Sequence, residues 1–191
     1  MNMNKMIIIA LFLLGVSTAN AQIKKGDIMM GGDLAGLNIS FSNQTSFQLT
    51  PKAAWFIKDG LAVGAYGQFG MTHVNGQDGS NYTYGIGPLG RYFFTDKLPV
   101  FQKAKLFVEA NAGFQGVNST VNDSNTNGLG FGVGPGVSYF ITPNIGLEAL
   151  LKYDGIVGFG SNTYTNGLTF SLGFQVYLPS KKVVSEIKSF E

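Results

Sequence analysis

The sequence predicts an all-β fold, specifically an eight-stranded antiparallel up-and-down transmembrane β-barrel. Three observations support this prediction: an export signal, a composition unusual for a soluble domain, and a hairpin unit that occurs three times. The chain has 27 glycines, 13% aromatic residues and only 13% charged residues, whereas about 25% charged residues is typical of soluble domains. Low charge without long apolar runs indicates strands whose two faces differ.

Residues 1–21 have the features of a cleaved signal peptide. Lys5 supplies the positive charge, residues 6–16 form an apolar run, and Ala19-Asn20-Ala21 is a typical cleavage site. The run is shorter than the roughly 20 residues that a transmembrane helix needs. We therefore expect export with cleavage after Ala21, a barrel over residues 22–178, and a short polar periplasmic tail over residues 179–191.

The charge and cysteine counts exclude several classes of protein. The formal net charge is +2, and part of it belongs to the signal, so there is no electrostatic basis for binding nucleic acid. The chain has no cysteine, and an exported chain of this kind cannot rely on a disulfide framework. Its stability has to come from packing and backbone pairing.

A repeated hairpin defines the architecture. Each copy has a proline, an aromatic pair four positions later, a turn and an apolar residue; the copies are PKAAWFIKDGL at 51–61, PLGRYFFTDKL at 88–98 and PGVSYFITPNI at 135–145. A second strand follows each copy and includes LAVGA, LFVEA or IGLEA. Each unit is therefore a strand, a turn and a strand.

Two further strands, near 28–41 and 166–178, complete the predicted set of eight. Turns are expected at 58–60, 95–105 and 142–144, and longer polar loops at 42–46, 74–81, 118–127 and 158–165. Short turns at one end and longer loops at the other are typical of outer-membrane barrels. The prolines at 51, 88 and 135 predict bulges, because proline cannot donate to a ladder.

Alternation with a period of two assigns the faces of these strands. The apolar face of the last strand contains Leu168, Phe170, Leu172, Phe174, Val176 and Leu178. On the equivalent outer face, the repeat places Trp55, Tyr92 and Tyr139 beside the turns. Amphipathic rings favour the boundary between membrane and water, so we predict that these three form part of an aromatic girdle.

The opposite face predicts a filled lumen. Phe56, Phe93, Phe140 and Tyr177 are expected to form a lumen plug near the turns, and the charged residues above them are Lys52, Arg91, Glu109, Glu148 and Lys152. Buried carboxylates need partners, so we expect a structural ion network in which Arg91 and Lys152 pair with the glutamates. The interior of an eight-stranded barrel is just wide enough for side chains to fill it.

The A-N-A-Q signal end, the KKGD start and the GPLGRYF segment at 87–93 resemble the small outer-membrane β-barrels of the Bacteroidetes type. That family is related in architecture to the OmpX-type barrels and to the OmpA transmembrane domain. The resemblance covers roughly residues 22–178 and implies a Gram-negative outer membrane. It also implies contact with outer-membrane lipid and lipopolysaccharide, and with the barrel assembly machinery during insertion.

No pattern of catalytic, cofactor-binding or metal-binding residues emerges. GIGPLG at 85–90 matches the G-x-G-x-x-G of dinucleotide-binding loops, but that motif needs a following helix, and here an alternating strand follows. His73, the single histidine, is expected at a solvated rim. Lipid A deacylases carry a His-x-Ser, and residues 73–75 read His-Val-Asn instead.

The sequence thus favours a non-enzymatic, monomeric outer-membrane barrel with a structural or surface-interaction role and no cofactor. One alternative is a narrow, porin-like channel or carrier for small solutes, motivated by lumen-facing glycines that would leave voids: Gly85, Gly87, Gly132, Gly134 and Gly136. A further alternative is a soluble lipocalin-like binder, which would require the two faces to be reversed. Any extracellular partner would bind the polar loops.

Overall fold

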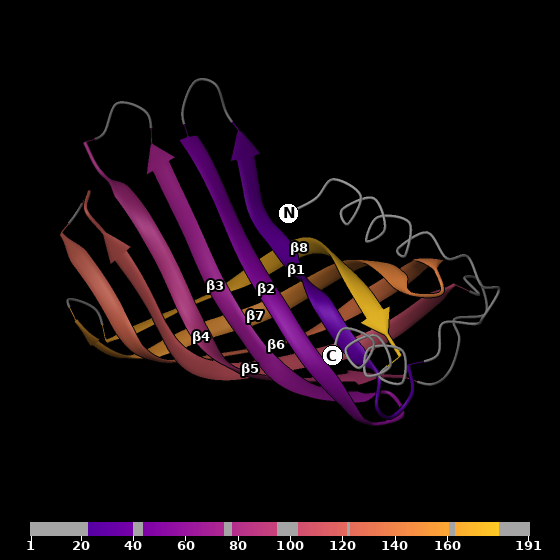
Figure 1. Ribbon diagram of the computed structural model, residues 1–191. Coiled ribbons are helices and arrows are strands. Elements are labelled where there is room, and N and C mark those ends of the chain that lie inside the picture. Colours follow the sequence, from indigo (N-terminus) through magenta and orange to yellow (C-terminus); the bar gives the residue numbers. More distant parts are fainter. Residues whose placement is uncertain are drawn as a thin grey trace, which may run out of the picture.

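A computed structural model describes residues 23–39, 44–74, 78–94, 103–121, 123–160 and 163–179. The eight strands are β1 (Ile28–Ile39), β2 (Gln44–Lys58), β3 (Leu61–Val74), β4 (Ser80–Phe93), β5 (Ala104–Ser119), β6 (Ser124–Thr142), β7 (Ile145–Gly160) and β8 (Tyr164–Leu178). They form a closed barrel in sequence order, with every neighbouring pair antiparallel (Figure 1). The predicted fold class is therefore confirmed. The predicted signal peptide and most of the predicted tail lie outside the described residues.

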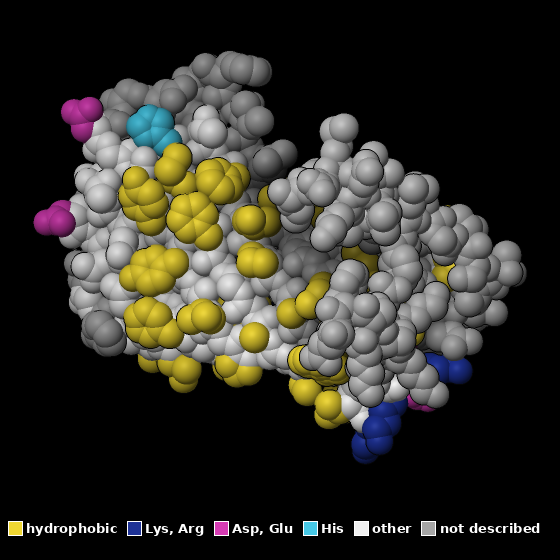
Figure 2. Space-filling view, in the orientation of Figure 1, with side chains coloured by type: hydrophobic (Ala, Val, Ile, Leu, Met, Phe, Trp, Pro, Cys, Tyr) yellow, Lys and Arg dark blue, Asp and Glu magenta, His cyan; other side chains and the backbone are white. Residues whose placement is uncertain are grey.

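The two faces of the strands differ as the alternation predicts. Along β6, buried and more exposed residues alternate from Thr126 to Phe140. Figure 2 shows hydrophobic side chains spread over the outer wall, with lysine and arginine at one end of the barrel and acidic side chains and the histidine toward the other. Within the described ranges there is no helix of the length and apolarity that a membrane crossing needs.

We call the two ends of the barrel the turn end, where residues 59–60 and 143–144 connect strands, and the loop end, opposite to it. The strands extend farther toward the loop end than predicted, because residues expected in loops pair with neighbouring strands. Asn118 pairs with Asn125, and Ser119 pairs with Ser124. Ladder hydrogen bonds use backbone groups, so a polar segment can continue a strand once its neighbour is in register.

The prediction of bulges at the three repeated prolines is wrong. Around Pro88 the ladder between β4 and β5 lacks pairs for residues 87 and 88, yet the register is the same on both sides. Pro51 and Pro135 have the same kind of gap, always toward the following strand. Proline lacks only its own N–H, so losing ladder bonds on one side is sufficient and no extra residue is inserted.

Close backbone approach accompanies the gap at Pro88. A Cβ added to Gly87 would lie 2.6 Å from the Cα of Gly113, on the neighbouring strand. Glycine is required there because no side chain fits between the two backbones. The register shifts occur elsewhere, between Ala35 and Asn38 and beside the two tight turns, at Phe56/Lys58 and Phe140/Thr142.

The barrel closes between β1 and β8 over only part of their length. Their ladder runs from the pair Ile28 and Leu178 to the pair Ala35 and Ser171. Beyond that point β1 continues beside β2, and β8 continues beside β7 as far as Tyr164. In Figure 1 the loop ends of β1 and β2 point to the top, whereas the loop-end half of β8 runs to the left.

Candidate functional site

The centre of the lumen is occupied by an arginine between two glutamates. Arg91 on β4 and Glu109 on β5 are direct ladder partners. The guanidinium donates to the Glu109 Oε2 atom from Nη2 at 2.6 Å and from Nε at 3.0 Å. Its Nη1 donates to both oxygens of Glu148, on β7, at 2.8 and 2.7 Å. All three side chains are buried, so one cation ties together strands from opposite sides of the barrel.

Lys52 extends this network toward β1. Its Nζ donates to the Glu109 Oε1 atom at 2.6 Å and also to Asp33. Asp33 was not among the predicted network residues, although strand alternation places it on the lumen face with Met29 and Ala35, which are also buried. Lys152 lies at the edge of the network, with its Nζ 3.9 Å from Glu109 and 3.6 Å from Asp154.

An aromatic cluster fills the lumen on the turn-end side of the network. Phe56, Phe93, Phe140 and Tyr177 are all buried. The ring centroids of Phe140 and Tyr177 are 5.2 Å apart, and those of Phe56 and Phe93 are 6.1 Å apart. The Tyr177 hydroxyl donates to Glu148 at 2.8 Å and so links this cluster to the ion network.

Phe107 is a fifth member of the aromatic cluster that the repeat did not identify. Its ring centroid is 5.3 Å from that of Phe93, and the Arg91 guanidinium carbon lies 4.1 Å above it. Its position two residues before Glu109 places it on the lumen face, so strand alternation alone could have found it. The contact with Arg91 is a cation–π interaction in a buried setting.

The lumen-facing glycines do not leave voids. A Cβ added to Gly136 would lie 2.6 Å from Cε2 of Phe107, and one added to Gly132 would lie 2.7 Å from Oδ1 of Asn111 and 3.0 Å from Cε of Lys152. Side chains from neighbouring strands therefore occupy the space over Gly132 and Gly136, and neighbouring backbone occupies the space over Gly87 and Gly134. This finding removes the observation on which the sequence-based channel alternative depends.

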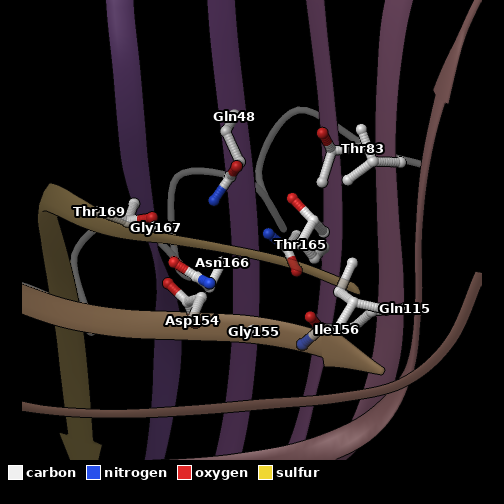
Figure 3. Close-up of a pocket in the computed structure, with 12 residues that line it drawn as sticks. Gln48, Thr83, Gln115, Asp154, Gly155, Ile156, Thr165, Asn166, Gly167 and Thr169 are labelled. Carbon is white, nitrogen blue, oxygen red and sulfur yellow. The ribbon is translucent and has the colours of Figure 1, made fainter. Parts of the chain in front are cut away.

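On the loop-end side of the network the lumen opens into a cavity of about 180 Å³, which we call the vestibule. It is lined by residues of six strands: Gln48, Gln68, Thr83, Gln115, Val117, Asp154, Gly155, Ile156, Thr165, Asn166, Gly167 and Thr169. Figure 3 shows the polar ends of Gln48, Gln115 and Asp154 directed into the same space. The Gln115 amide also donates to the Tyr66 hydroxyl at 2.7 Å, toward the ion network.

The outer wall carries aromatic side chains at both ends of the barrel. At the turn end Trp55 is 59% exposed, and Tyr92 and Tyr139 are also exposed. Together with the buried charges inside, this arrangement is the opposite of the one that a soluble lipocalin-like binder requires. At the loop end the exposed aromatic residues include Phe69, Tyr82, Phe114 and Tyr164, which the sequence-based girdle did not include.

A ring of polar side chains lies among the loop-end aromatics. Tyr84 donates to Asn127, the Asn127 amide donates to Asn118 at 3.2 Å, and the Asn118 amide donates to the Tyr84 hydroxyl at 3.3 Å. By strand alternation all three side chains are on the outer face. Amide and hydroxyl groups are costly in hydrocarbon, so this ring marks where the apolar part of the wall ends.

His73 contacts a serine that the sequence motif did not indicate, because the two residues are partners across β3 and β4. Its Nδ1 is 3.2 Å from the Ser80 hydroxyl and 2.9 Å from the carbonyl oxygen of Gly79. A carbonyl only accepts, so the shorter contact requires a proton on Nδ1. That nitrogen then has no lone pair with which to activate Ser80 as a nucleophile.

Small outer-membrane β-barrels are among the solved structures that this fold resembles. One is Neisserial surface protein A, with a TM-score of 0.55 and 19% identity over 80% of this chain and 97% of that chain. Another is the N-terminal β-barrel domain of OprF from Pseudomonas aeruginosa, with a TM-score of 0.51 and 14% identity over 81% and 98%. At these identities the likeness concerns the fold alone. No family model and no curated protein matches the chain.

Proposed function

We propose that this protein is an integral outer-membrane barrel that is closed to solutes and has a structural or surface-interaction role, without enzymatic activity. The carrying observation is the combination of a lumen filled by the Arg91 network and the aromatic cluster with an outer wall rich in exposed apolar side chains. A wall of that kind is stable when lipid covers it. Because the lumen is filled, other molecules would contact this protein at its outer wall and at its loop end.

The proposed type of membrane and the proposed surrounding molecules rest on the sequence. The signal-like residues 1–21 and the GPLGRYF segment support export to a Gram-negative outer membrane of the Bacteroidetes type. In that setting the surrounding molecules are outer-membrane lipid and lipopolysaccharide, and the assembly machinery acts during insertion. We take the barrel to be monomeric, with any protein partner bound through the loop end.

Two measurements test the location. Fractionation of the cell envelope should place the chain with outer-membrane markers, and heat-modifiable migration should show a compact band in unheated detergent samples. A barrel retains its ladder in detergent until heated, because every strand has neighbours on both sides over most of its length. A soluble periplasmic product that migrates identically with and without heating would contradict the proposal.

Planar-bilayer recording tests whether the lumen is closed. The purified protein should give no conductance steps, because Arg91, Lys52 and the glutamates span the lumen above a buried aromatic layer. Reproducible steps from the unaltered chain would instead favour the channel alternative. The control is the same preparation after heat denaturation, which reports leakage that does not pass through a folded barrel.

A further inference from the structure

One edge of β8 has no described ladder partner in the loop-end half of the barrel. Residues 164–170 pair with β7 on one side. On the other side the pairing with β1 begins only at Ser171, within the part of the chain that the structure describes. Residues 167–170 have no ladder partner among residues 36–39 of β1, and we call this boundary between β1 and β8 the seam.

The vestibule lies directly behind the seam. The vestibule lining includes four residues from the loop-end half of β8, which pair with β7 alone among the described strands: Thr165, Asn166, Gly167 and Thr169 (Figure 3). A Cβ added to Gly167 would meet no atom within 4 Å. The cavity therefore has open space at the strand that forms the side of the seam.

The outer side of the same stretch is strongly apolar. Leu168 is 72% exposed and Phe170 is 59% exposed. Strand alternation places these two side chains outside and Thr165, Gly167 and Thr169 inside. Apart from Asn166, the edge of β8 is thus polar toward the vestibule and apolar toward the outer wall, which matches a molecule with a polar head and an apolar chain.

The vestibule favours an uncharged head. Its acidic residue, Asp154, is 3.6 Å from the Lys152 ammonium, which is also 3.9 Å from Glu109. The rest of the lining offers mainly amides and hydroxyls, which serve as both donors and acceptors. A cavity of about 180 Å³ has room for a small hydroxylated head.

Asn111 supplies a second, independent indication of a ligand. Its side chain is 7% exposed, and neither its Oδ1 nor its Nδ2 has a hydrogen-bond partner among the described residues. It lies next to Asp154, a residue of the vestibule lining, since both side chains would meet a Cβ added to Gly132. A buried amide without partners is costly, and a hydroxylated head or the water that accompanies it would satisfy this amide.

We propose that the vestibule binds the head of a single-chain amphiphile with an uncharged, hydroxylated headgroup, which enters sideways from the membrane through the seam. The apolar chain then lies over Leu168 and Phe170, outside the barrel. The proposal rests on the proposed membrane insertion and adds a ligand class and an entry route to it. The ion network below the vestibule stops the ligand from passing farther.

Hydrogen exchange of the protein in lipid nanodiscs tests the seam. Amides of residues 167–170 that point toward β1 should exchange at least tenfold faster than those of residues 172–176, which have ladder partners on both sides. Equal protection of the two halves of β8 would overturn the entry route. Heat-modifiable migration of the same sample separates this outcome from failure to form a membrane barrel.

Photocrosslinking tests the ligand class. The probe is a monoacylglycerol with a diazirine in its acyl chain, added to the protein in phosphatidylcholine nanodiscs. Labelling should be saturable, concentrated on residues 164–170, and reduced at least fivefold by unlabelled monoacylglycerol. The variant Gly167→Leu should lower the labelling by a similar factor, because the new side chain enters the vestibule.

Gly90→Leu is the matched control, because a Cβ at Gly90 also meets no atom within 4 Å while Gly90 faces outward on β4. It should label as the unaltered protein does. Labelling spread evenly around the barrel would overturn the proposal, as would equal loss in both variants. If lysophosphatidylglycerol reduces the photolabelling as much as monoacylglycerol does, the preference for an uncharged head is refuted. If free glycerol reduces the labelling, the requirement for an acyl chain is refuted.

Discussion

Arg91 and Glu109 face each other as direct partners across β4 and β5, and the guanidinium donates to a single carboxylate oxygen at 2.6 and 3.0 Å. The remaining nitrogen of Arg91 is committed to Glu148 on the other side of the lumen. Every charge in this cluster thus depends on a residue from another strand. Removing the shared cation should leave the buried Glu148 carboxylate without a cation and Glu109 with Lys52 as its close partner.

Arg91→Leu should lower the free energy of unfolding by about 3–5 kcal/mol, because removing one partner of a buried ion pair leaves the other charge buried and uncompensated. The measurement is equilibrium unfolding in urea with the protein in detergent or lipid. Adding Glu109→Gln and Glu148→Gln to Arg91→Leu should recover part of the loss. Lys58→Leu, at an exposed position beside the turn, is the control and should change stability little. A loss from Arg91→Leu below about 1 kcal/mol, as for an exposed pair, would contradict the network's role.

Phe107→Ala should destabilise the barrel by about 3–5 kcal/mol, the usual cost of emptying the site of a buried phenylalanine. The ring packs against Phe93 and beneath the Arg91 guanidinium. Phe114→Ala is the matched control, because Phe114 is on the same strand and 49% exposed on the outer wall. The same urea experiment compares them, and equal losses would show that Phe107 has no special place in the lumen.

Gly136→Ala should cost about 1–3 kcal/mol through overpacking, because the added methyl group would meet the Phe107 ring at 2.6 Å. Gly90→Ala adds the same methyl group where nothing lies within 4 Å and should be nearly neutral. Shrinking the neighbour with Phe107→Leu should relieve part of the cost of Gly136→Ala. If the two glycine variants unfold alike, the lumen is looser than the structure shows.

Leu151→Arg should cost about 2–4 kcal/mol in a bilayer, because Leu151 is exposed on the outer wall near the middle of β7 and a lipid-facing arginine is most costly at the midplane. Asn125→Arg, at the loop end of β6, should cost about 0–1 kcal/mol, as expected near the interface. Unfolding in liposomes provides the comparison. Equal, small effects at both positions would argue against lipid around this wall.

Much of the barrel could be predicted from residues near one another in the chain. Strand alternation depends only on the pleat, so the outward position of Trp55 and the inward position of Arg91 follow from local sequence. The three hairpins followed from the repeat. The bulges predicted at the prolines were wrong, because a strand can lose ladder bonds on one side without changing register.

The sequence by itself determined the fold class, the number of strands and the face on which each residue lies, because period-two alternation and a repeated hairpin are local properties of the chain. Only the tertiary structure decided which side chains meet across the lumen. Closure of the barrel brings Lys52 to Glu109, and Arg91 to Glu148, at sequence separations that no local pattern records. The seam between β1 and β8 also belongs to the tertiary structure, because it depends on where two strands from opposite ends of the chain cease to pair.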